Sequence, residues 1–593
     1  MAGMAPGAMS AGLAEVSAVQ TYLDISAGNR VFTSLYDFEP PVLARTGKRI
    51  PGWDEFVRRA ESAPAEIVPG LLATTLKDVG IAVSADPLLT SPALIAADED
   101  GKVARTKPYE CVDRRCPGLS VVPATVGELG GIVAGLEDDD LLIAIERPPP
   151  PKRESLAIGI AGEGFDGNLT SDTTRTDGFV AATDIAPTVL EHFGLGVPDE
   201  MSGRPIRADG DPDAAAVVER TDRMRVVAGR RSPVILDNLM IWLALALLVS
   251  LLSRGRWAGP AFTIGGLATL YLPLLLLVAA ALQPSLIGER LIVGLGAPAL
   301  AALTLLLARG WRPLAIACAV TVCAYAVDVI AGSPLTARSL LGPNPGLGVR
   351  FFGIGNELES SLVVLTTVGV GAALAAVRAR LGRPPSTRAA IAAFLVTGAV
   401  FAAIFAAGRF GADVGAAIVF PAAAAMAALA VPGALARRRL VLLVIGAPVA
   451  GVILLALLDL LLGGDAHLTR SVLEAGGRDE LADVFERRLR LSASSFGRAT
   501  GQTLFWVVMA AIAVLIWQRR RVLSWLSPEP LVRAGFAGGA GSILLGTLAN
   551  DSGAAFLIIG TIALLGCLAV AYGVHVRKDS GHTAGAEAGG TLH

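Results

Sequence analysis

Long apolar stretches alternate with short polar loops in the chain after about residue 236, whereas the part before it mixes short apolar and polar runs. A helix that crosses a membrane needs about 20 mostly apolar residues. Eleven stretches meet or approach this length, at 236–253, 259–282, 291–308, 314–332, 358–377, 389–407, 414–435, 440–463, 504–518, 536–549 and 554–574. Two of these, 504–518 and the glycine-rich 536–549, are short, so we expect a tilted, broken or re-entrant path there. The pattern predicts an all-α polytopic membrane domain with about 11 transmembrane helices at 233–576.

The loops between these stretches alternate in charge. Every second loop holds a dense group of basic residues, namely Arg254 and Arg256; Arg309 and Arg312; Arg378, Arg380, Arg383 and Arg388; Arg437, Arg438 and Arg439; Arg519, Arg520, Arg521 and Arg533; and Arg577 and Lys578. The opposing loops hold no basic group of that density. Because basic loops remain in the cytoplasm, we expect residues 1–232 to form an extracytoplasmic domain. The C-terminus, with a disordered tail at 577–593, is then cytoplasmic.

Composition agrees with this division and excludes several classes of protein. Of the 593 residues, 53% are hydrophobic and only 17% are charged, whereas a soluble globular chain usually carries about 25% charge. The formal net charge is −2, so the chain lacks the basic field that holds nucleic acid. Aromatic residues make up 5%, which also disfavours a surface for stacking bases. What remains is a membrane protein with one large soluble domain and no nucleic-acid partner.

The soluble part has the pattern of alternating helices and strands. Residues 69–79 are typical of a helix, and the short apolar runs at 81–83, 141–145 and 156–161 are typical of buried strands. Such alternation predicts an α/β sandwich.

The segment 178–206 is the most informative part of the soluble domain. It has the pattern of a strand followed by a helix that Thr183 or Asp184 caps, with Pro187 in the first turn and Gly194 at the end. The sequence D-I-A-P-T at 184–188 resembles a helix of the alkaline phosphatase superfamily, which includes sulfatases and phosphodiesterases. Residues 22–30 are similar to the segment that follows the nucleophile there. The resemblance covers about residues 10–210 and implies an alkaline phosphatase-like α/β fold for the domain 1–232.

The chemistry of that superfamily is only partly represented. Its members hold two metals with several Asp and His residues around a Ser or Thr nucleophile, whereas His192 is the single histidine of residues 1–232. The strand at 141–145 runs into Glu146 where the family has Ser-Asp-His-Gly, and Asp177 stands where the family has a His. The departures predict that the domain is not an active metallophosphatase and holds no metal or other cofactor.

Some residues keep a hydrolytic role open. Ser17 lies near the nucleophile position, with Thr21 as a rival, and a hydroxyl nucleophile needs an activating base or metal. The carboxylates that would suit a divalent cation such as Ca2+ or Mg2+ are Glu146, Asp166, Asp172 and Asp177.

The start of the chain and its cysteines bear on its location. The family's first strand has no counterpart before residue 10, and residues 1–25 lack the pattern of an export signal. We therefore expect the natural N-terminus to lie upstream of Met1. Cys111 and Cys116 are expected to close a small disulfide loop outside the cytoplasm.

Four polar motifs lie where the predicted loops meet the predicted spans, and all face the extracytoplasmic side. They are 350–359, 408–415, 465–467 and 550–553. Charges at membrane depth cost several kcal/mol unless they are paired or hydrated. The sequence therefore predicts an outward-facing polar cleft whose candidate binding residues are Asp328, Arg350, Asn356, Glu357, Arg409, Asp413, Asp459, Asn550 and Asp551.

Two interpretations of these motifs remain open. Arg350 and Arg409 suit a phosphate or carboxylate head group, and Glu357, Asp413 and Asp551 suit a cation or a transferred proton. Alternatively, the motifs are tight turns with ion pairs, such as Arg409 with Asp413 or Asp551.

The order of domains resembles that of a group of bacterial envelope proteins. We expect a cell-membrane protein whose degenerate exodomain and polar cleft recognise or handle an anionic lipid-linked or polymeric envelope component. Its expected partners are a membrane lipid or lipid-linked precursor and envelope-assembly proteins. One alternative is an active phospho- or sulfo-ester hydrolase or transferase. Another is an ion-coupled lipid transporter in which Asp328, Asp413 and Asp459 are the coupling sites.

Overall fold

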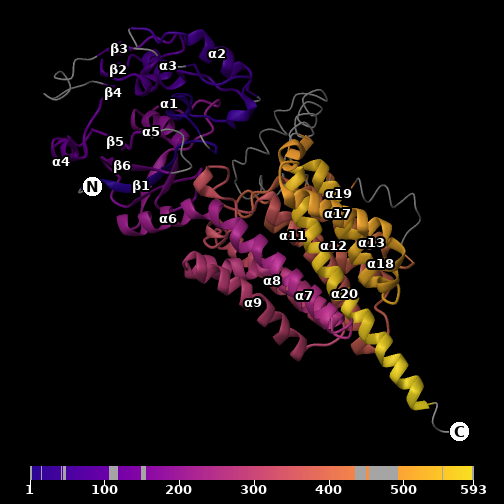
Figure 1. Ribbon diagram of the computed structural model, residues 1–593. Coiled ribbons are helices and arrows are strands. Elements are labelled where there is room, and N and C mark those ends of the chain that lie inside the picture. Colours follow the sequence, from indigo (N-terminus) through magenta and orange to yellow (C-terminus); the bar gives the residue numbers. More distant parts are fainter. Residues whose placement is uncertain are drawn as a thin grey trace. The chain divides into compact units, whose positions relative to one another are not determined.

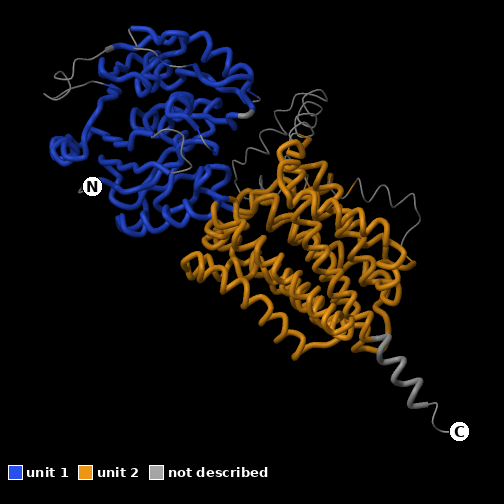
Figure 2. The backbone as a smooth tube through the Cα atoms, viewed as in Figure 1, with its two compact units in different colours: residues 1–228, 344–352 blue, residues 229–343, 353–593 orange. Residues whose placement is uncertain are grey.

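The chain folds into two compact units (Figure 2). The computed structural model describes residues 3–433, 446, 449–451, 453 and 492–589, without 15, 42, 44–47, 64, 106–117, 149–154, 494 and 551. Unit 1 comprises Met1–Ala228 and Asn344–Phe352, and unit 2 comprises Gly229–Pro343 and Gly353–His593. The short segment 344–352 therefore belongs to unit 1 although both of its neighbours in the chain belong to unit 2, which the sequence does not predict.

Unit 1 is built around a four-stranded sheet with the strand order β5-β6-β1-β8 (Figure 1). Its strands are β1 (Ala5–Ser10), β5 (Leu142–Ile145), β6 (Leu156–Ala161) and β8 (Phe179–Ala181). β1 runs antiparallel to β6 and parallel to β8, with Met9 opposite Val180. Two smaller sheets contain β2 (Val83–Ala85), β3 (Ala104–Arg105) and β4 (Leu119–Val121), and β7 (Asn168–Ser171) and β9 (Ile206–Asp209).

Strand β1 corrects one expectation. The sequence predicts no counterpart of the family's first strand before residue 10, but a strand is present there, with Ala5, Ala8 and Met9 buried in the middle of the sheet. The segment has none of the β-branched or aromatic residues that favour strands, and Pro6 and Gly7 are rare inside them. A strand that is buried on both faces also shows no alternation of apolar and polar residues.

Among the described residues of unit 1, six α-helices accompany these sheets. They are α1 (Ala18–Ala27), α2 (Trp53–Glu61), α3 (Leu71–Asp78), α4 (Val126–Ala134), α5 (Ile185–His192) and α6 (Ala214–Arg231). One core joins Ile25 of α1, Leu72 of α3 and Leu190 of α5 to Met9 of β1 and Ile158 of β6. The predicted mixture of helices and strands around a buried sheet is therefore present.

Most of the individual elements predicted for unit 1 are also confirmed. The helix expected at 69–79 is α3, and the strands expected at 141–145 and 156–161 are β5 and β6. The strand expected at 81–83 lies two residues later, as β2. Strand β8 leads into α5 through a turn of 3-10 helix at Ala182–Asp184, as the segment 178–206 indicates.

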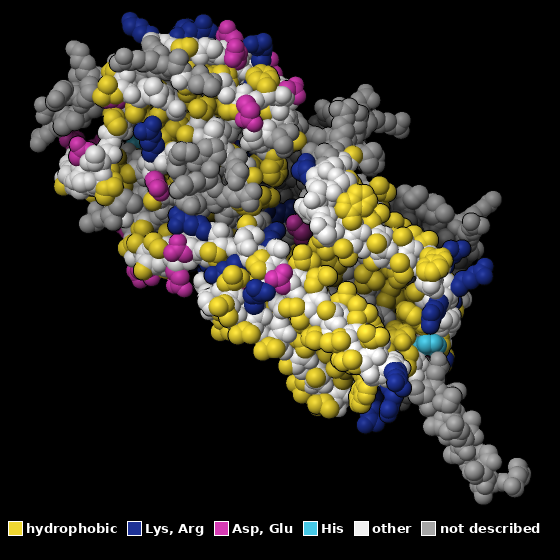
Figure 3. Space-filling view, viewed as in Figure 1, with side chains coloured by type: hydrophobic (Ala, Val, Ile, Leu, Met, Phe, Trp, Pro, Cys, Tyr) yellow, Lys and Arg dark blue, Asp and Glu magenta, His cyan; other side chains and the backbone are white. Residues whose placement is uncertain are grey.

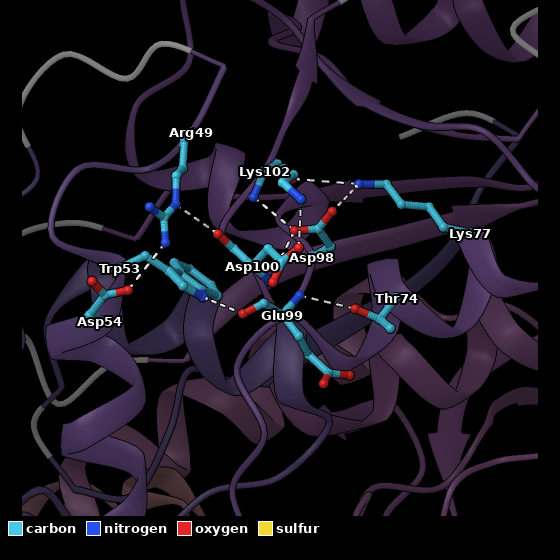
Figure 4. A network of polar contacts seen from close by, with 9 residues as sticks. All are labelled: Arg49, Trp53, Asp54, Thr74, Lys77, Asp98, Glu99, Asp100 and Lys102. Carbon is cyan, nitrogen blue, oxygen red and sulfur yellow. Dashed lines mark hydrogen bonds and ion pairs between the residues drawn. The ribbon is translucent and has the colours of Figure 1, made fainter.

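A turn at residues 98–102 is held by polar contacts to two helices (Figure 4). Lys77 of α3 donates to Asp98 Oδ2 at 2.9 Å, and Trp53 Nε1 of α2 donates to the carbonyl oxygen of Glu99 at 2.7 Å. The Asp98 carboxylate and the Lys77 ammonium neutralise each other. The contacts hold the turn 98–102 against α2 and α3, so this network has a structural role.

Unit 2 is a bundle of helices (Figure 1). They are α7 (Asp237–Leu252), α8 (Ala258–Leu282), α9 (Leu286–Leu307), α10 (Arg312–Ile330), α11 (Asn356–Leu381), α12 (Thr387–Ala406), α13 (Val414–Ala430), α17 (Thr503–Trp517), α18 (Arg519–Leu526), α19 (Pro530–Ala549) and α20 (Gly553–Gly589). Within the described part of the chain, eight helices are long and apolar enough to cross a membrane. α13 is shorter, and α17 and α18 form a pair bent by 75°. The predicted stretch at 440–463 lies almost wholly outside the described residues.

The outer surface of unit 2 is strongly apolar (Figure 3). Leucines stand exposed along α7 and α9, for example Leu247 and Leu251 on the first and Leu295 and Leu306 on the second. Contiguous apolar surface on helices of this length is typical of protein in contact with lipid. Unit 2 is therefore a multi-pass membrane domain.

The two short predicted stretches have different outcomes. The one at 504–518 is the single helix α17 (Thr503–Trp517), which ends at the 75° bend before α18. The glycine-rich one is the continuous helix α19, which packs against α11 and α13. An added Cβ at Gly535 would lie 2.6 Å from Thr367 O of α11, and one at Gly538 would lie 2.6 Å from Ala423 O of α13. The glycines of α19 therefore allow close packing of helices.

We expect Gly535→Ala to lower the thermal unfolding temperature, because the added methyl group meets the carbonyl oxygen of Thr367. Overpacking of this kind costs about 1–3 kcal/mol. Gly265→Ala in α8 is the matched control, since nothing lies within 4 Å of its added Cβ and alanine favours a helix. Scanning fluorimetry of the purified protein in detergent compares the two variants. Equal unfolding temperatures would contradict the close approach of α19 to α11.

Candidate functional site

Three predicted polar motifs meet inside unit 2. The first turn of α11, the turn before α13 and the end of α19 contribute Glu359, Asp413 and Asn550, which we call the carboxylate cluster. The exposed fractions of these residues are 0%, 2% and 4%. Asn550 Nδ2 lies 3.4 Å from Glu359 Oε2. An added Cβ at Gly415 would lie 2.6 Å from Asn550 Oδ1 and 2.9 Å from Glu359 Oε2, so the start of α13 fits against both side chains.

Asp413 holds the first turn of α13 in place. Its Oδ1 accepts the N–H of Gly415 at 3.1 Å, so the residue is the N-cap of the helix. The turn before it is tied to the segment before α11, because Ile354 N–H donates to Gly411 O at 3.1 Å. The predicted motifs 350–359 and 408–415 are therefore in direct backbone contact.

Glu357 makes an ion pair closer to the surface. Its Oε1 lies 3.8 Å from Arg231 Nη1, and both side chains are partly exposed. Arg231 Nη2 also donates to Gly342 O at 2.9 Å. Asn356 is the first residue of α11, at the same end of the helix. Exposed ion pairs contribute little to stability. Because Glu357 is partly exposed and Glu359 is buried, Glu357 lies at the rim of this end of the bundle and Glu359 in its interior.

Asp328 has a structural environment that the sequence does not predict. It lies in the last turn of α10 and accepts hydrogen bonds from Leu335 N at 3.0 Å, Thr336 N at 2.7 Å and Thr336 Oγ1 at 2.5 Å. Three donors satisfy this buried carboxylate and hold the turn that follows α10. The structure does not bring Asp328 into the carboxylate cluster.

The remaining predicted binding residues lie elsewhere. Arg350 belongs to unit 1. Arg409 is exposed in the turn that leads into α13. Asp459 and Asp551 lie outside the described residues, as does the motif 465–467.

Two residues of this region are missing from the predicted set. Glu359 is the deepest acid of α11, and only apolar and small hydroxyl residues follow it for several turns. That position, the last acid before an apolar run, is a signal that the sequence contains. Arg231 carries no such signal, because its partners Glu357 and Gly342 are distant in the chain.

Ser17 is the N-cap of α1. Its Oγ accepts the N–H of Gln20 at 3.2 Å, and its carbonyl oxygen accepts the hydroxyl of Thr21 at 3.4 Å. Both hydroxyls therefore have roles in starting the helix, and a nucleophilic role for Ser17 stays a prediction.

The acids considered for a divalent cation are spread over unit 1. Asp177 pairs with Arg220 at 3.1 Å, Asp172 lies 3.7 Å from Arg207, and Glu146 Oε2 accepts the N–H of Ala157 at 2.9 Å. In the part of the chain that the structure describes, no group of three or more His, Cys, Asp or Glu could hold a metal ion. Cys111 and Cys116 lie outside the described residues.

The D-I-A-P-T motif has a clear structural basis. Its carboxylate, Asp184, accepts hydrogen bonds at 2.6–3.0 Å from Ser171 Oγ, Thr173 Oγ1, Ala181 N and Arg204 N. Burial raises the pKa of Asp184, and these hydrogen bonds oppose that shift. His192 is exposed at the end of α5, with its ring 5.1 Å from that of Phe193.

The comparisons with known proteins add no relative. No protein-family model, no curated protein and no solved structure matches this chain.

Asp24 is a buried acid of unit 1 with a strongly raised pKa. It is buried in α1, where Gln20 Nε2 donates to its Oδ1 at 2.6 Å. Burial raises the pKa of Asp24 to about 7, while the hydrogen bond from Gln20 and the positive charges of Arg30 and Arg59 act against that shift.

A pH-dependent stability of unit 1 follows. Between the unfolded pKa of about 4 and a folded pKa of about 7, the folded state binds a proton that the unfolded chain releases. The contribution of Asp24 to stability is therefore fully present below pH 4 and is lost as the pH rises to 7, by as much as about 4 kcal/mol. We expect Asp24→Asn to flatten this profile. Hydrogen exchange of the α1 amides, corrected for intrinsic rates, measures it, and identical profiles for the variant and the wild type would exclude this role of Asp24.

Proposed function

We propose that this chain is an envelope membrane protein that binds a proton or a small cation at the carboxylate cluster. It uses that binding in handling an anionic, lipid-linked envelope component. The observation that carries the proposal is the burial of Glu359, Asp413 and Asn550 at the ends of three packed membrane helices.

The chemistry of the cluster favours a positively charged ligand. Two carboxylates and an amide provide oxygen atoms, which are the ligands that hard cations prefer. A carboxylate among apolar helices is also stabilised by taking up a proton. Changes in the occupancy of such a site alter how closely α11, α13 and α19 pack, since Gly415 fits directly against Glu359 and Asn550.

The alternation of basic loops gives the cluster an orientation. If basic loops are cytoplasmic, the first turn of α11, the start of α13 and the end of α19 all lie at the outer face of the membrane. That these three ends also meet in unit 2 agrees with their being placed on one side of the membrane. The proposed topology has unit 1 extracytoplasmic, the C-terminus cytoplasmic and about 11 spans.

The anionic component is proposed from the arginines at the same end. Arg409 is exposed in the turn directly before Asp413, and Arg231 lies beside Glu357 at the rim. Guanidinium groups suit phosphate and carboxylate head groups.

We propose that unit 1 is an alkaline phosphatase-like domain that recognises its ligand without hydrolysing it. The order of β1, α1, β8 and α5, with Asp184 holding the turn between β8 and α5, supports the likeness. Ser17 caps a helix, and Asp177 forms an ion pair with Arg220. Both contacts support the interpretation that the domain does not hydrolyse its ligand.

The cation site is tested by labelling with dicyclohexylcarbodiimide, which adds to protonated carboxyl groups in apolar surroundings. We expect mass spectrometry to find the adduct on Glu359 or Asp413, with labelling at least ten-fold slower at high pH or in added Na+. Glu359→Gln and Asp413→Asn should each reduce it. Glu289 is the matched control, because it is equally buried but forms an ion pair with Arg230 at 3.1 Å and should stay unlabelled. The proposed cation site would be refuted if neither Glu359 nor Asp413 were labelled, or if the rate of labelling did not change with pH or Na+.

Handling of an anionic lipid is tested in proteoliposomes that contain fluorescent phosphatidylglycerol. We expect the wild-type protein and the neutral variant Gly265→Ala, whose added Cβ meets nothing within 4 Å, to move the lipid between leaflets in a way that depends on pH or Na+. Glu359→Gln should lose that dependence. Movement is read from the fraction of lipid that a membrane-impermeant quencher reaches. If the protein is labelled at the cluster acids but moves no lipid, the proposed cation site stands and the proposed handling of an anionic lipid is refuted.

A further inference from the structure

Residues 344–352, which we call the strap, come from the connection between α10 and α11 but are packed within unit 1 (Figure 2). The N–H of Ala14 donates to the carbonyl oxygen of Leu347 in the strap at 2.7 Å. Asn344 and Pro345 at its start are buried. The strap is therefore packed as an integral part of unit 1, although in sequence it lies in the loop between the membrane helices α10 and α11.

The middle of the strap lies against the end of β1. Gly348 has a φ of +65°, and an added Cβ there would overlap Gly12 O and Ser10 Oγ. Ser10 is the last residue of β1. Arg30 Nη1 donates to Ser10 Oγ at 3.5 Å. Only glycine satisfies both the backbone conformation and the close approach.

The end of the strap is held by aromatic side chains. Phe351 is buried, with its ring 5.9 Å from that of Phe179 of β8 and 5.1 Å from Arg30 Cζ. The ring of Phe352 lies 4.3 Å from Arg175 Cζ. Cation–π contacts and aromatic pairs are both favourable, so these contacts hold the strap in a defined position.

The position of the strap has a functional meaning. Ligands of open α/β sheets bind outside the carboxyl ends of parallel strands. β1 and β8 are such a parallel pair, and the strap lies against the carboxyl end of β1 at Ser10 and Gly12. Only Gly353, Ile354 and Gly355 separate Phe352 from Asn356, the first residue of α11. Such a link spans at most about 14 Å when fully extended. Phe352 therefore cannot lie farther than this from the start of α11, the helix that carries Glu359.

We propose that the strap is an internal closure of the ligand-binding end of β1, and that its release transmits a change in unit 1 to the first turn of α11. A ligand that reaches the carboxyl end of β1 must first displace the strap. The strap then acts as a mechanical connection between the soluble domain and the membrane domain. This inference does not depend on what the carboxylate cluster binds.

Hydrogen exchange of the full chain in lipid nanodiscs tests the proposal. In the wild type we expect the amide of Ala14 and the amides of the strap to be protected. Gly348→Ala should raise their exchange at least ten-fold. Gly382→Ala is the matched control, because Gly382 has nearly the same φ, +68°, but nothing lies within 4 Å of its added Cβ. Unprotected strap amides in the wild type, or equal behaviour of the two variants, would overturn the docking of the strap.

The connection to α11 has its own readout in the same experiment. Release of the strap by Gly348→Ala should raise exchange across the first turn of α11, at 356–361, at least three-fold, whereas Gly382→Ala should not. If Gly348→Ala fails to fold, Phe351→Ala replaces it, since removal of the ring frees the end of the strap without straining the backbone. Release of the strap with no change at 356–361 would overturn the mechanical connection and leave only a local closure.

Discussion

A carboxylate among apolar membrane helices must have its charge compensated, and this requirement organises one end of unit 2. Transfer of an uncompensated charge into such surroundings is costly, whereas a paired or hydrogen-bonded charge is tolerated. Glu289 meets the requirement with Arg230, 3.1 Å away. Asp328 meets it with backbone and hydroxyl donors of the turn after α10. Each of these acids is thereby committed to a structural partner.

The carboxylate cluster meets the same requirement differently. Glu359 contacts the amide of Asn550 at 3.4 Å. Asp413 caps α13 with one oxygen and uses the positive end of the helix. Because three helix ends converge there, a proton or cation that compensates the charge also changes how they pack. This is the physical link between a local charge and a movement of helices.

The sequence predicts the parts of this arrangement that depend on local pattern. The helices α8 to α12 follow from apolar length, and the candidate set includes Asp413 and Asn550 because charged and amide residues flank apolar runs. β1 is not predicted, since small residues with Pro6 and Gly7 show neither strand propensity nor alternation. Glu359 is overlooked in favour of Glu357, although depth in the helix separates the two. The pairing of Arg231 with Glu357 depends on tertiary structure alone.

The strap belongs to the same class of unpredictable features, and its physical basis explains why. Its sequence, with glycines at 346 and 348 and a Pro at 345, is that of an ordinary loop between two membrane helices. Nothing in that pattern indicates that Gly348 must approach the end of β1, or that Phe351 completes a cluster with Phe179 and Arg30. A loop whose sequence belongs to the membrane domain thus completes the core of unit 1, and it restricts the end of β1 while it stays docked. Only three residues separate Phe352 from Asn356 and they span at most about 14 Å, so a change in the docking of the strap occurs close in the chain to the first turn of α11.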